Sequence, residues 1–212
     1  GYLRLSMQRL DNSCPVLQWC KQFGEIIREQ FQGSDEPLHI HDIGCNVGHF
    51  CRVLPELQHQ VTYHGYDVSE TYLGLARQRH SRHSFSLLDI ATETPQNNSD
   101  VSVISATLEH IELWETALEH ILKTTRQLVL LRSFFGMQPA SDMYKKEQAK
   151  HPYLIRQFTF EQVAVVAESK GFSIRFVRDR ATDSIPQYLG SGVTRTQYIA
   201  ILKKLGKCIL ST

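Results

Sequence analysis

The stretch that most constrains the fold is 38–54, LHIHDIGCNVGHFCRVL, where the pattern changes from strand to turn to helix. Apolar, partly β-branched residues precede Gly44, as in a buried strand, and the apolar residues from Val47 onward recur at helical spacing. Glycine allows a positive φ and lets a ligand approach the backbone closely. A helix that follows such a turn directs its free N–H groups into the same space. The stretch therefore predicts a strand–turn–helix unit that binds a small ligand.

The turn resembles the first motif of the class I S-adenosylmethionine-dependent methyltransferases, an acidic residue followed by glycines at alternate positions. Here it reads DIGCNVG from Asp42 to Gly48, with Asn46 in place of the middle glycine. Asparagine tolerates left-handed backbone, so we expect the turn to keep its shape. The resemblance implies S-adenosylmethionine as the cofactor and S-adenosylhomocysteine as its product. It also implies cofactor contacts from Asp42, Gly44, Cys45, Gly48 and Phe50.

A dinucleotide-binding turn is the main alternative for this stretch, and two features disfavour it. Such a turn needs G-x-G-x-x-G, so that backbone amides can hold a pyrophosphate, whereas the glycines here read G-x-x-x-G. A carboxylate at Asp42 would also repel a phosphate, while the methyl donor carries an ammonium and a sulfonium. The pattern therefore favours the methyl donor over NAD.

A second strand is predicted at 61–66, and it ends at Asp67, 23 residues after Gly44. A carboxylate at this position can bind both hydroxyls of a ribose. The run GYDVSETYLGLAR is similar to the second motif of the family, and the resemblance implies cofactor contacts from Asp67 and Val68. The alternative for Asp67 is a purely local role as a cap of the following helix, for which Ser69 is also a candidate N-cap.

Two further strands, 85–88 and 100–105, precede the remaining expected cofactor contacts. Ligands bind at the carboxyl ends of strands in an open α/β sheet. In the family, the residues after the third strand accept from the adenine amino group and pack on its ring. The resemblance implies that Asp89, Ile90 and Ala106 contact the cofactor.

His110 is the candidate catalytic residue, because histidine titrates near neutral pH and this one follows the fourth strand. It would act as a general base if the acceptor is a hydroxyl or a protonated amine. The alternative is a histidine that hydrogen-bonds a neighbouring loop. Methyl transfer depends mainly on near-attack geometry and on the exclusion of water, so a base is optional.

Strands and helices alternate along most of the chain, which predicts an α/β fold. We expect a Rossmann-like, doubly wound, mostly parallel seven-stranded sheet with helices on both faces and an antiparallel last strand. Beyond the segments named above, strands are expected at 126–132, 172–178 and 197–202 and a helix at 113–122. A further helix is expected from the N-cap Thr159, with Gln162 as its capping-box partner, to Gly171.

The chain is expected to form a single methyltransferase domain, since 212 residues with 42% hydrophobic side chains suit one core. Its expected parts are an N-terminal helical cap (1–36), a donor-binding half (37–132), a lid over the acceptor (133–158) and a C-terminal half (159–212).

The cap and the lid are each predicted from side-chain pattern. The cap carries an amphipathic helix from Val16 to Phe31, with Ser13 as a candidate N-cap. The segment 133–158 breaks the rhythm of strands and helices, and loops this long are commonly functional. Its candidate apolar walls for an acceptor pocket are Phe134, Phe135, Met137, Tyr144 and Tyr153. The alternative is a surface excursion, and 179–195 is expected to be a second long loop.

Charge and cysteine content limit the partners. Lys and Arg number 23 against 22 Asp and Glu, so the net charge of +1 implies no polyanionic partner, and nucleic acid is not expected. Five cysteines without C-x-x-C spacing suit free thiols in a reducing, cytoplasmic compartment. No metal site and no membrane span are expected. Because the sequence does not begin with Met, we expect the natural chain to be longer.

The sequence therefore predicts an S-adenosylmethionine-dependent methyltransferase that acts on oxygen or nitrogen of a small-molecule or metabolite acceptor. One alternative is a catalytically silent module of the same fold that binds the cofactor or a partner. Another is RNA methylation, since Glu109-His110 matches the second half of a metal-binding Glu-x-x-Glu-His run. Ala106 stands where that run has its first Glu, which disfavours it. The acceptor and the oligomeric state stay open.

Overall fold

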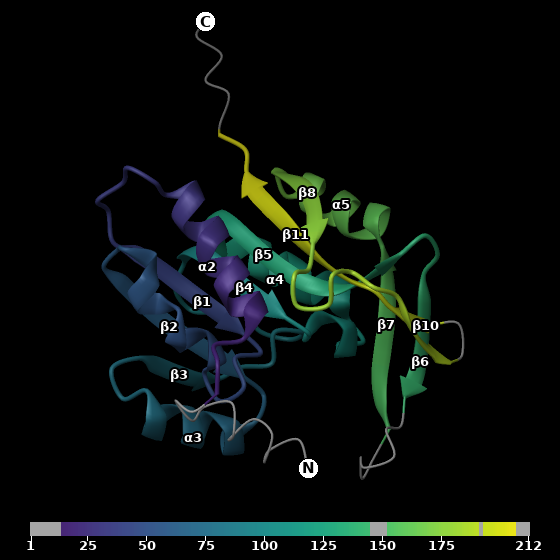
Figure 1. Cartoon of the computed structure of the whole chain (residues 1–212), viewed down its shortest axis with the longest axis horizontal. Coiled ribbons are helices and arrows are strands. Elements are labelled where there is room, and N and C mark those ends of the chain that lie inside the picture. The colour runs from purple at the N-terminus through teal and green to yellow at the C-terminus, as the bar shows by residue number, and fades with distance from the viewer. Residues whose placement is uncertain (1–13, 145–151, 191–192, 207–212) are drawn as a thin grey trace, which may run out of the picture.

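The computed structural model describes residues 14–144, 152–190 and 193–206. Their main sheet runs diagonally across Figure 1 in the order β3-β2-β1-β4-β5-β11-β8. The strands are β1 (Leu38–Ile43), β2 (Val61–Asp67), β3 (Ser84–Leu87), β4 (Ser99–Ser105), β5 (Thr125–Gly136), β8 (Phe172–Arg178) and β11 (Gln197–Lys204). The first five pair in parallel, and β11 runs antiparallel to both β5 and β8. The predicted Rossmann-like sheet with its antiparallel last strand is confirmed.

Helices cover both faces of this sheet. Figure 1 shows α2 (Gln18–Gln30) in front of the sheet and α4 (Trp114–Thr124) behind it. The core on the α2 side also takes residues from α3 (Glu70–Arg79), and α5 (Phe160–Ser169) contributes to the core on the α4 side. Side chains of β1, β4 and β5 alternate between the two cores, because successive strand residues point to opposite faces.

Three predicted helix boundaries can be compared with the structure. Ser69 caps α3 by accepting from the Tyr72 amide, and Thr159 and Gln162 form the predicted capping box of α5. Helix α2 begins at Gln18 without a side-chain cap, and the predicted cap Ser13 lies outside the described residues. None of the described helices is long and apolar enough to cross a membrane.

The α-helix predicted directly after the first turn is wrong. Two short 3-10 turns take its place, η1 (His49–Arg52) and η2 (Leu54–Leu57). Pro55 lacks an N–H and its ring excludes the helical bond to the carbonyl four residues earlier, while Gln58 is left-handed and ends the segment. The apolar residues of the pattern are still buried, but no α-helix N-terminus faces the turn.

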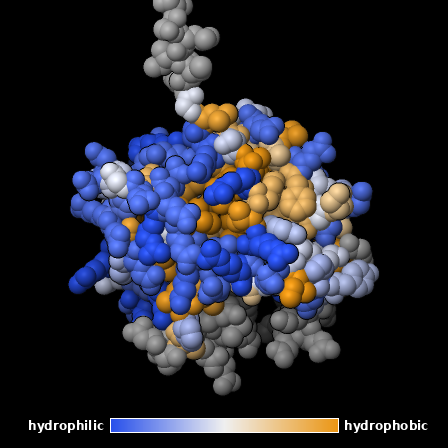
Figure 2. Space-filling model, turned by 45° about the horizontal axis from the view of Figure 1, so that its top comes forward, coloured by the Kyte–Doolittle hydropathy of each residue, from blue (hydrophilic) through white to orange (hydrophobic). Residues whose placement is uncertain are grey.

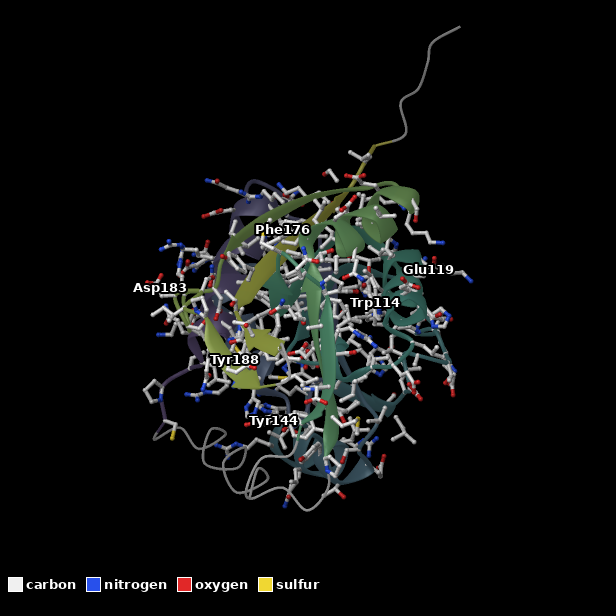
Figure 3. The ribbon with its side chains drawn as sticks, turned by 90° about the vertical axis from the view of Figure 1, so that its right-hand side faces the viewer. Trp114, Glu119, Tyr144, Phe176, Asp183 and Tyr188 are labelled. Carbon is white, nitrogen blue, oxygen red and sulfur yellow. The ribbon has the colours of Figure 1, made fainter. Side chains whose placement is uncertain are left out.

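The described parts of the lid segment 133–158 are also not a loop. Strand β5 continues to Gly136 and is followed by an antiparallel pair, β6 (Ala140–Tyr144) and β7 (Tyr153–Thr159), which extends the sheet. The predicted loop 179–195 likewise contains the hairpin strands β9 (Gln187–Gly190) and β10 (Val193–Arg195). Figure 3 looks onto β6 and β7 and shows Tyr188 of β9 on one side of β7 and Trp114 of α4 on the other.

These hairpins have a small core of their own, which explains why the segment is ordered as strands. Phe134, Ile155 and Val193 are buried together there, with Tyr144 packed against them. Of the other predicted pocket walls, Phe135 is buried in the α4-side core, while Met137 is 84% exposed. Figure 2 shows a surface that is mostly hydrophilic on its left side, with an apolar area near the centre and smaller apolar areas around it.

Candidate functional site

The turn after β1 has the left-handed backbone that its sequence predicts. Gly44, Asn46 and Gly48 have φ of 73°, 54° and 82°. The Asn46 side chain stabilises its own conformation, since its Oδ1 accepts from the Val47 amide at 2.9 Å. A Cβ on residue 44 would lie 2.2 Å from Thr107 Oγ1, so glycine lets the loop after β4 pack directly against this turn.

Asp67 joins the end of β2 to this turn. Its Oδ2 accepts from the Asn46 amide and its Oδ1 from the Ser69 amide, both at 2.9 Å. Burial raises the pKa of Asp67, and these backbone donors oppose the shift. Each carboxylate oxygen has more than one lone pair, so both can still accept from ribose hydroxyls. The local cap and the ligand contact are therefore compatible.

Asp42 lies deeper than the sequence alone indicates. It is buried on the α2 side, where the Tyr63 hydroxyl donates to its Oδ2 at 2.7 Å. Burial raises the pKa of Asp42 to about 7, although the hydrogen bond from Tyr63 opposes this shift. The full negative charge expected at the mouth of the turn is thus only partly present at neutral pH, which weakens the charge argument against a phosphate.

The other predicted cofactor contacts divide between the open edge and the cores. At the edge, Val68 is 68% exposed, Asp89 is exposed, and the Leu88 amide donates to the Asp67 carbonyl. Ala106 follows β4 there with a φ of 54°. In contrast, Cys45, Phe50 and Ile90 are buried, and Phe50 stacks on Trp19 with ring centroids 6.2 Å apart.

His110 touches the hairpin rather than the turn. It is exposed, and its Nδ1 lies 2.7 Å from the Leu154 carbonyl oxygen, so Nδ1 carries the proton and donates. Its ring meets Tyr153 edge-on, with centroids 5.2 Å apart. In the neutral imidazole this bond leaves the lone pair on Nε2. The neighbouring Glu109 is fully buried, and the Ser133 hydroxyl donates to its Oε2 at 2.7 Å.

A buried ion pair on the α2 side of the same edge was missed by the sequence analysis. Arg132 of β5 donates through Nε and Nη2 to Asp179, at 2.9 and 3.0 Å. Burial alone would raise the pKa of Asp179, but the Arg132 guanidinium holds it below its ordinary value. Gln197 of β11 accepts from the same guanidinium. The available signal was an arginine inside the apolar run QLVLLRSFF.

The histidines and acids do not form a metal site in the part of the chain that the structure describes. No group of three His, Cys, Asp or Glu side chains there has the arrangement of metal ligands. Glu109 and His110 are adjacent in sequence, but one is buried against β5 and the other faces β7. The arrangement offers hydrogen-bonding and acid–base groups at the carboxyl edge of the sheet.

Comparison with known proteins agrees with this geometry. A methyltransferase domain model matches residues 41–128. CalS10, an amino pentose methyltransferase of Micromonospora echinaspora solved with bound SAM, has a TM-score of 0.70 at 11% identity, with 97% of each chain covered. A TehB-like SAM-dependent methyltransferase of Corynebacterium glutamicum has a TM-score of 0.64 at 14% identity, with 96% of each chain covered.

A third solved structure is the magnesium protoporphyrin IX methyltransferase ChlM of Synechocystis PCC 6803 with bound SAM. Its TM-score is 0.61 at 16% identity, over 89% of this chain and 79% of that one. At such identities the likeness concerns the fold, and a comparison with curated protein sequences finds no match. The domain match, the strand order and the left-handed glycine turn of this chain are together similar to those of the class I S-adenosylmethionine-dependent methyltransferases.

Proposed function

We propose that the chain binds S-adenosylmethionine at the carboxyl ends of β1 to β4 and transfers its methyl group to oxygen or nitrogen of a small-molecule acceptor. The observation that carries the proposal is the contact of the left-handed turn with Asp67, because it joins the two sequence motifs in space. When bound, the cofactor supplies a methyl group on a positively charged sulfur.

The residues at this edge suit the adenosine half of the cofactor. In this proposal Asp67 accepts from the ribose hydroxyls with the lone pairs that the Asn46 and Ser69 amides leave. Val68 and Leu87, at the ends of β2 and β3, are apolar yet 68% and 59% exposed. Apolar side chains commonly line ligand sites. We propose that Val68 and Leu87 flank the adenine ring and that Asp89 accepts from the adenine amino group. Phe50 and Ile90 support this site from the cores.

The acceptor side is proposed to lie between the loop after β4 and the β6–β7 hairpin. His110 is the base in this proposal, because the Leu154 carbonyl fixes its proton on Nδ1 and leaves Nε2 to take a proton from the acceptor. Tyr153 packs on the His110 ring and Tyr144 packs on Tyr153, which gives the hairpin an aromatic side at this point. Near-attack alignment supplies most of the rate enhancement.

A small-molecule acceptor fits the charge of the chain and the proteins that share its fold. The net charge of +1 provides no general attraction to nucleic acid. CalS10 and ChlM, by their names, act on an amino pentose and on a porphyrin. The second candidate is a silent cofactor-binding module. It is favoured by the hydrogen bond from His110 to the Leu154 carbonyl, which gives this histidine a structural role without catalysis.

Calorimetry tests cofactor binding, and an extract of metabolites with methyl-labelled donor tests transfer. We expect S-adenosylmethionine and S-adenosylhomocysteine to bind and NAD not to bind. Tighter binding of NAD would contradict the proposal. Binding of the donor without label transfer to any metabolite would favour the silent module, and label transfer to added RNA instead would contradict a small-molecule acceptor.

A further inference from the structure

Four residues lie side by side at one level of the sheet, where the parallel strands end. In the strand register, Ile43, Tyr66, Ile104 and Leu131 are neighbours on β1, β2, β4 and β5. The next residues along these strands are therefore also level with one another: Gly44, Asp67, Ser105 and Arg132. The side chains of Asp67, Ser105 and Arg132 share the α2 face, since the residues two positions before Ser105 and Arg132 pack in the α2-side core.

The two ends of this row differ in hydrogen-bonding character. Asp67, on β2, offers hydrogen-bond acceptors, while Arg132, on β5, offers donors. Neighbouring strands are about 4.8 Å apart, so β2 and β4 are separated by about 10 Å and β2 and β5 by about 14 Å. The cofactor has the same order of groups, with ribose hydroxyls at one end of an aliphatic chain and a carboxylate at the other.

The hydrogen bonds around Arg132 leave donors unused. Asp179 takes Nε and Nη2, whereas among the described residues Nη1 has only the Ser105 hydroxyl, at 3.5 Å, which is the limit of a hydrogen bond. Thr182 also donates to Asp179 Oδ2 through its amide and its hydroxyl, so this oxygen is fully used.

Gln197 adds a second set of unused donors. Its Oε1 must face the Arg132 guanidinium, which fixes the orientation of the amide. Its Nε2 is buried and has no hydrogen-bond partner among the residues that the structure describes. Buried donors without a partner are rare and costly, so a molecule with acceptor oxygens is expected beside them. Planar carboxylates match a guanidinium best.

We propose that Arg132, Gln197 and Ser105 hold the carboxylate of the methionyl end of the cofactor, opposite the ribose at Asp67. This inference rests on the proposed function, because it takes S-adenosylmethionine as the ligand. It makes Arg132 and Gln197 cofactor-binding residues, although they stand outside the glycine turn and both known motifs. Arg132 is 8% exposed at its side chain, so the carboxylate is held in a nearly dry site where each charge-assisted bond is strong.

The test compares two ligands that differ only in the carboxylate. S-adenosylhomocysteine has it, while 5′-S-(3-aminopropyl)-5′-thioadenosine keeps the adenosine, the thioether and the amine without it. Calorimetry should show that the wild-type chain prefers the first. Gln197→Glu keeps the bond to Arg132 but removes the free donors and adds a repelling charge. We expect this variant to bind S-adenosylhomocysteine about 10- to 100-fold more weakly than the wild-type chain, and the amine less than about twofold more weakly.

Ser105→Ala should lower the ratio of the affinity for S-adenosylhomocysteine to the affinity for the amine, as Gln197→Glu does, but by a smaller amount. This variant keeps the inference testable if Gln197→Glu fails to fold. Gln22→Ala is the control, because Gln22 binds the backbone of Arg178 and Arg180 beside the ion pair without touching Arg132. It should lower the unfolding temperature and leave the ligand ratio unchanged.

Three outcomes would overturn the inference, and they differ from a failure of the proposed function. If folded Gln197→Glu weakens both ligands equally, the network only supports the fold. If neither Gln197→Glu nor Ser105→Ala changes the ratio, the free donors bind something other than the cofactor. If the wild-type chain binds both ligands equally, no carboxylate site exists, although the adenosine site stands. Failure of the wild-type chain to bind either ligand would instead overturn the proposed function.

Discussion

The edge of the sheet that faces the ligand has two ends, and the contacts that form them differ in sequence separation. At the β1–β2 end, Asn46 and Asp67 meet across 21 residues, and the turn closes with bonds inside the segment 44–51. At the β5 end, His110 reaches Leu154 across 44 residues, and Arg132 reaches Asp179 across 47 and Gln197 across 65. The first end depends on local backbone conformation, while the second depends on correct packing of distant segments.

The largest effect is expected at the non-local end. We expect His110→Ala to lower kcat about 10²- to 10⁴-fold with little change in cofactor affinity, because a general base acts mainly in the transition state. The measurement is the pH–rate profile with an acceptor identified by label transfer. The variant should lack the general-base limb that the wild-type profile shows.

His110→Gln is the matched control, because its side-chain amide can still donate to the Leu154 carbonyl but cannot take a proton at neutral pH. It should restore the stability of the hairpin without restoring kcat. If instead it restores kcat, His110 only pins β7, and the non-local end contributes alignment alone.

At the local end, the largest effect is expected from Gly44→Ala. The new side chain meets a left-handed backbone and would lie 2.2 Å from Thr107 Oγ1. Strain and overpacking together should lower the free energy of unfolding by about 2–4 kcal/mol. Urea unfolding measures this. Gly74→Ala is the control, since nothing lies within 4 Å of its Cβ in helix α3, and it should stabilise the chain by about 0.5–1 kcal/mol.

Asp67→Ala should weaken cofactor binding by about 1.5–3 kcal/mol, the usual loss for hydrogen bonds to a charged group. Because Asp67 also holds the Asn46 amide, part of this loss reflects a looser turn. Ser69→Ala is the control for loss of the α3 cap, since it removes the cap and leaves the Asp67 carboxylate and its bond to the Asn46 amide in place. If both variants bind the cofactor like the wild-type chain, Asp67 has only the local role of holding the turn.

This difference in distance also explains what the sequence could predict. The strands from β1 to β5, the left-handed Asn46 and the capping box of α5 depend on neighbours within a few residues, and each was predicted. The helix after the turn failed because the apolar spacing outweighed Pro55, which ends such helices. Pro55 was therefore the residue in the sequence that argued against an α-helix here.

The hairpins and the buried ion pair could not be predicted from local pattern. Strands β6 and β7 hold together through partners far along the chain, such as Gln157, whose side chain links the Gln138 carbonyl to the Thr194 amide. Likewise, nothing near Arg132 in sequence indicates Asp179. Contacts of this kind follow from tertiary packing, which a single sequence does not specify.

A smaller effect concerns the buried face of β1 and β2, where His41 packs against His64 and Tyr66. Its Nδ1 has no hydrogen-bond partner among the described residues, and burial lowers its pKa to about 4. The unfolded chain therefore takes up the proton first as the pH falls. The stability that His41 contributes is fully present above about pH 6.5 and is lost as the pH approaches 4.

His41→Leu should flatten this dependence by up to about 1.4 kcal/mol per pH unit between these limits. Urea unfolding of both proteins at pH 5 and pH 7 measures the difference. Asp42 acts in the opposite sense, because its pKa is raised to about 7 and its contribution falls as the pH rises from about 4 to 7. Since Asp42 is present in both proteins, the difference isolates His41. Parallel curves would contradict the buried, neutral state of His41.

The smallest effect is expected at Asn46, where the sequence departs from the alternate glycines of the family motif. Asn46→Gly relieves the left-handed strain but removes the bond to the Val47 amide, and these changes, each about 1 kcal/mol, should nearly cancel. Asn46→Ala loses the bond and keeps the strain, so it should cost about 1–2 kcal/mol. Urea unfolding of the pair decides whether asparagine or glycine is the better residue for this turn. If alanine is as stable as asparagine, the side-chain bond does not hold the turn, and the contact from Asp67 to the Asn46 amide must set its conformation instead.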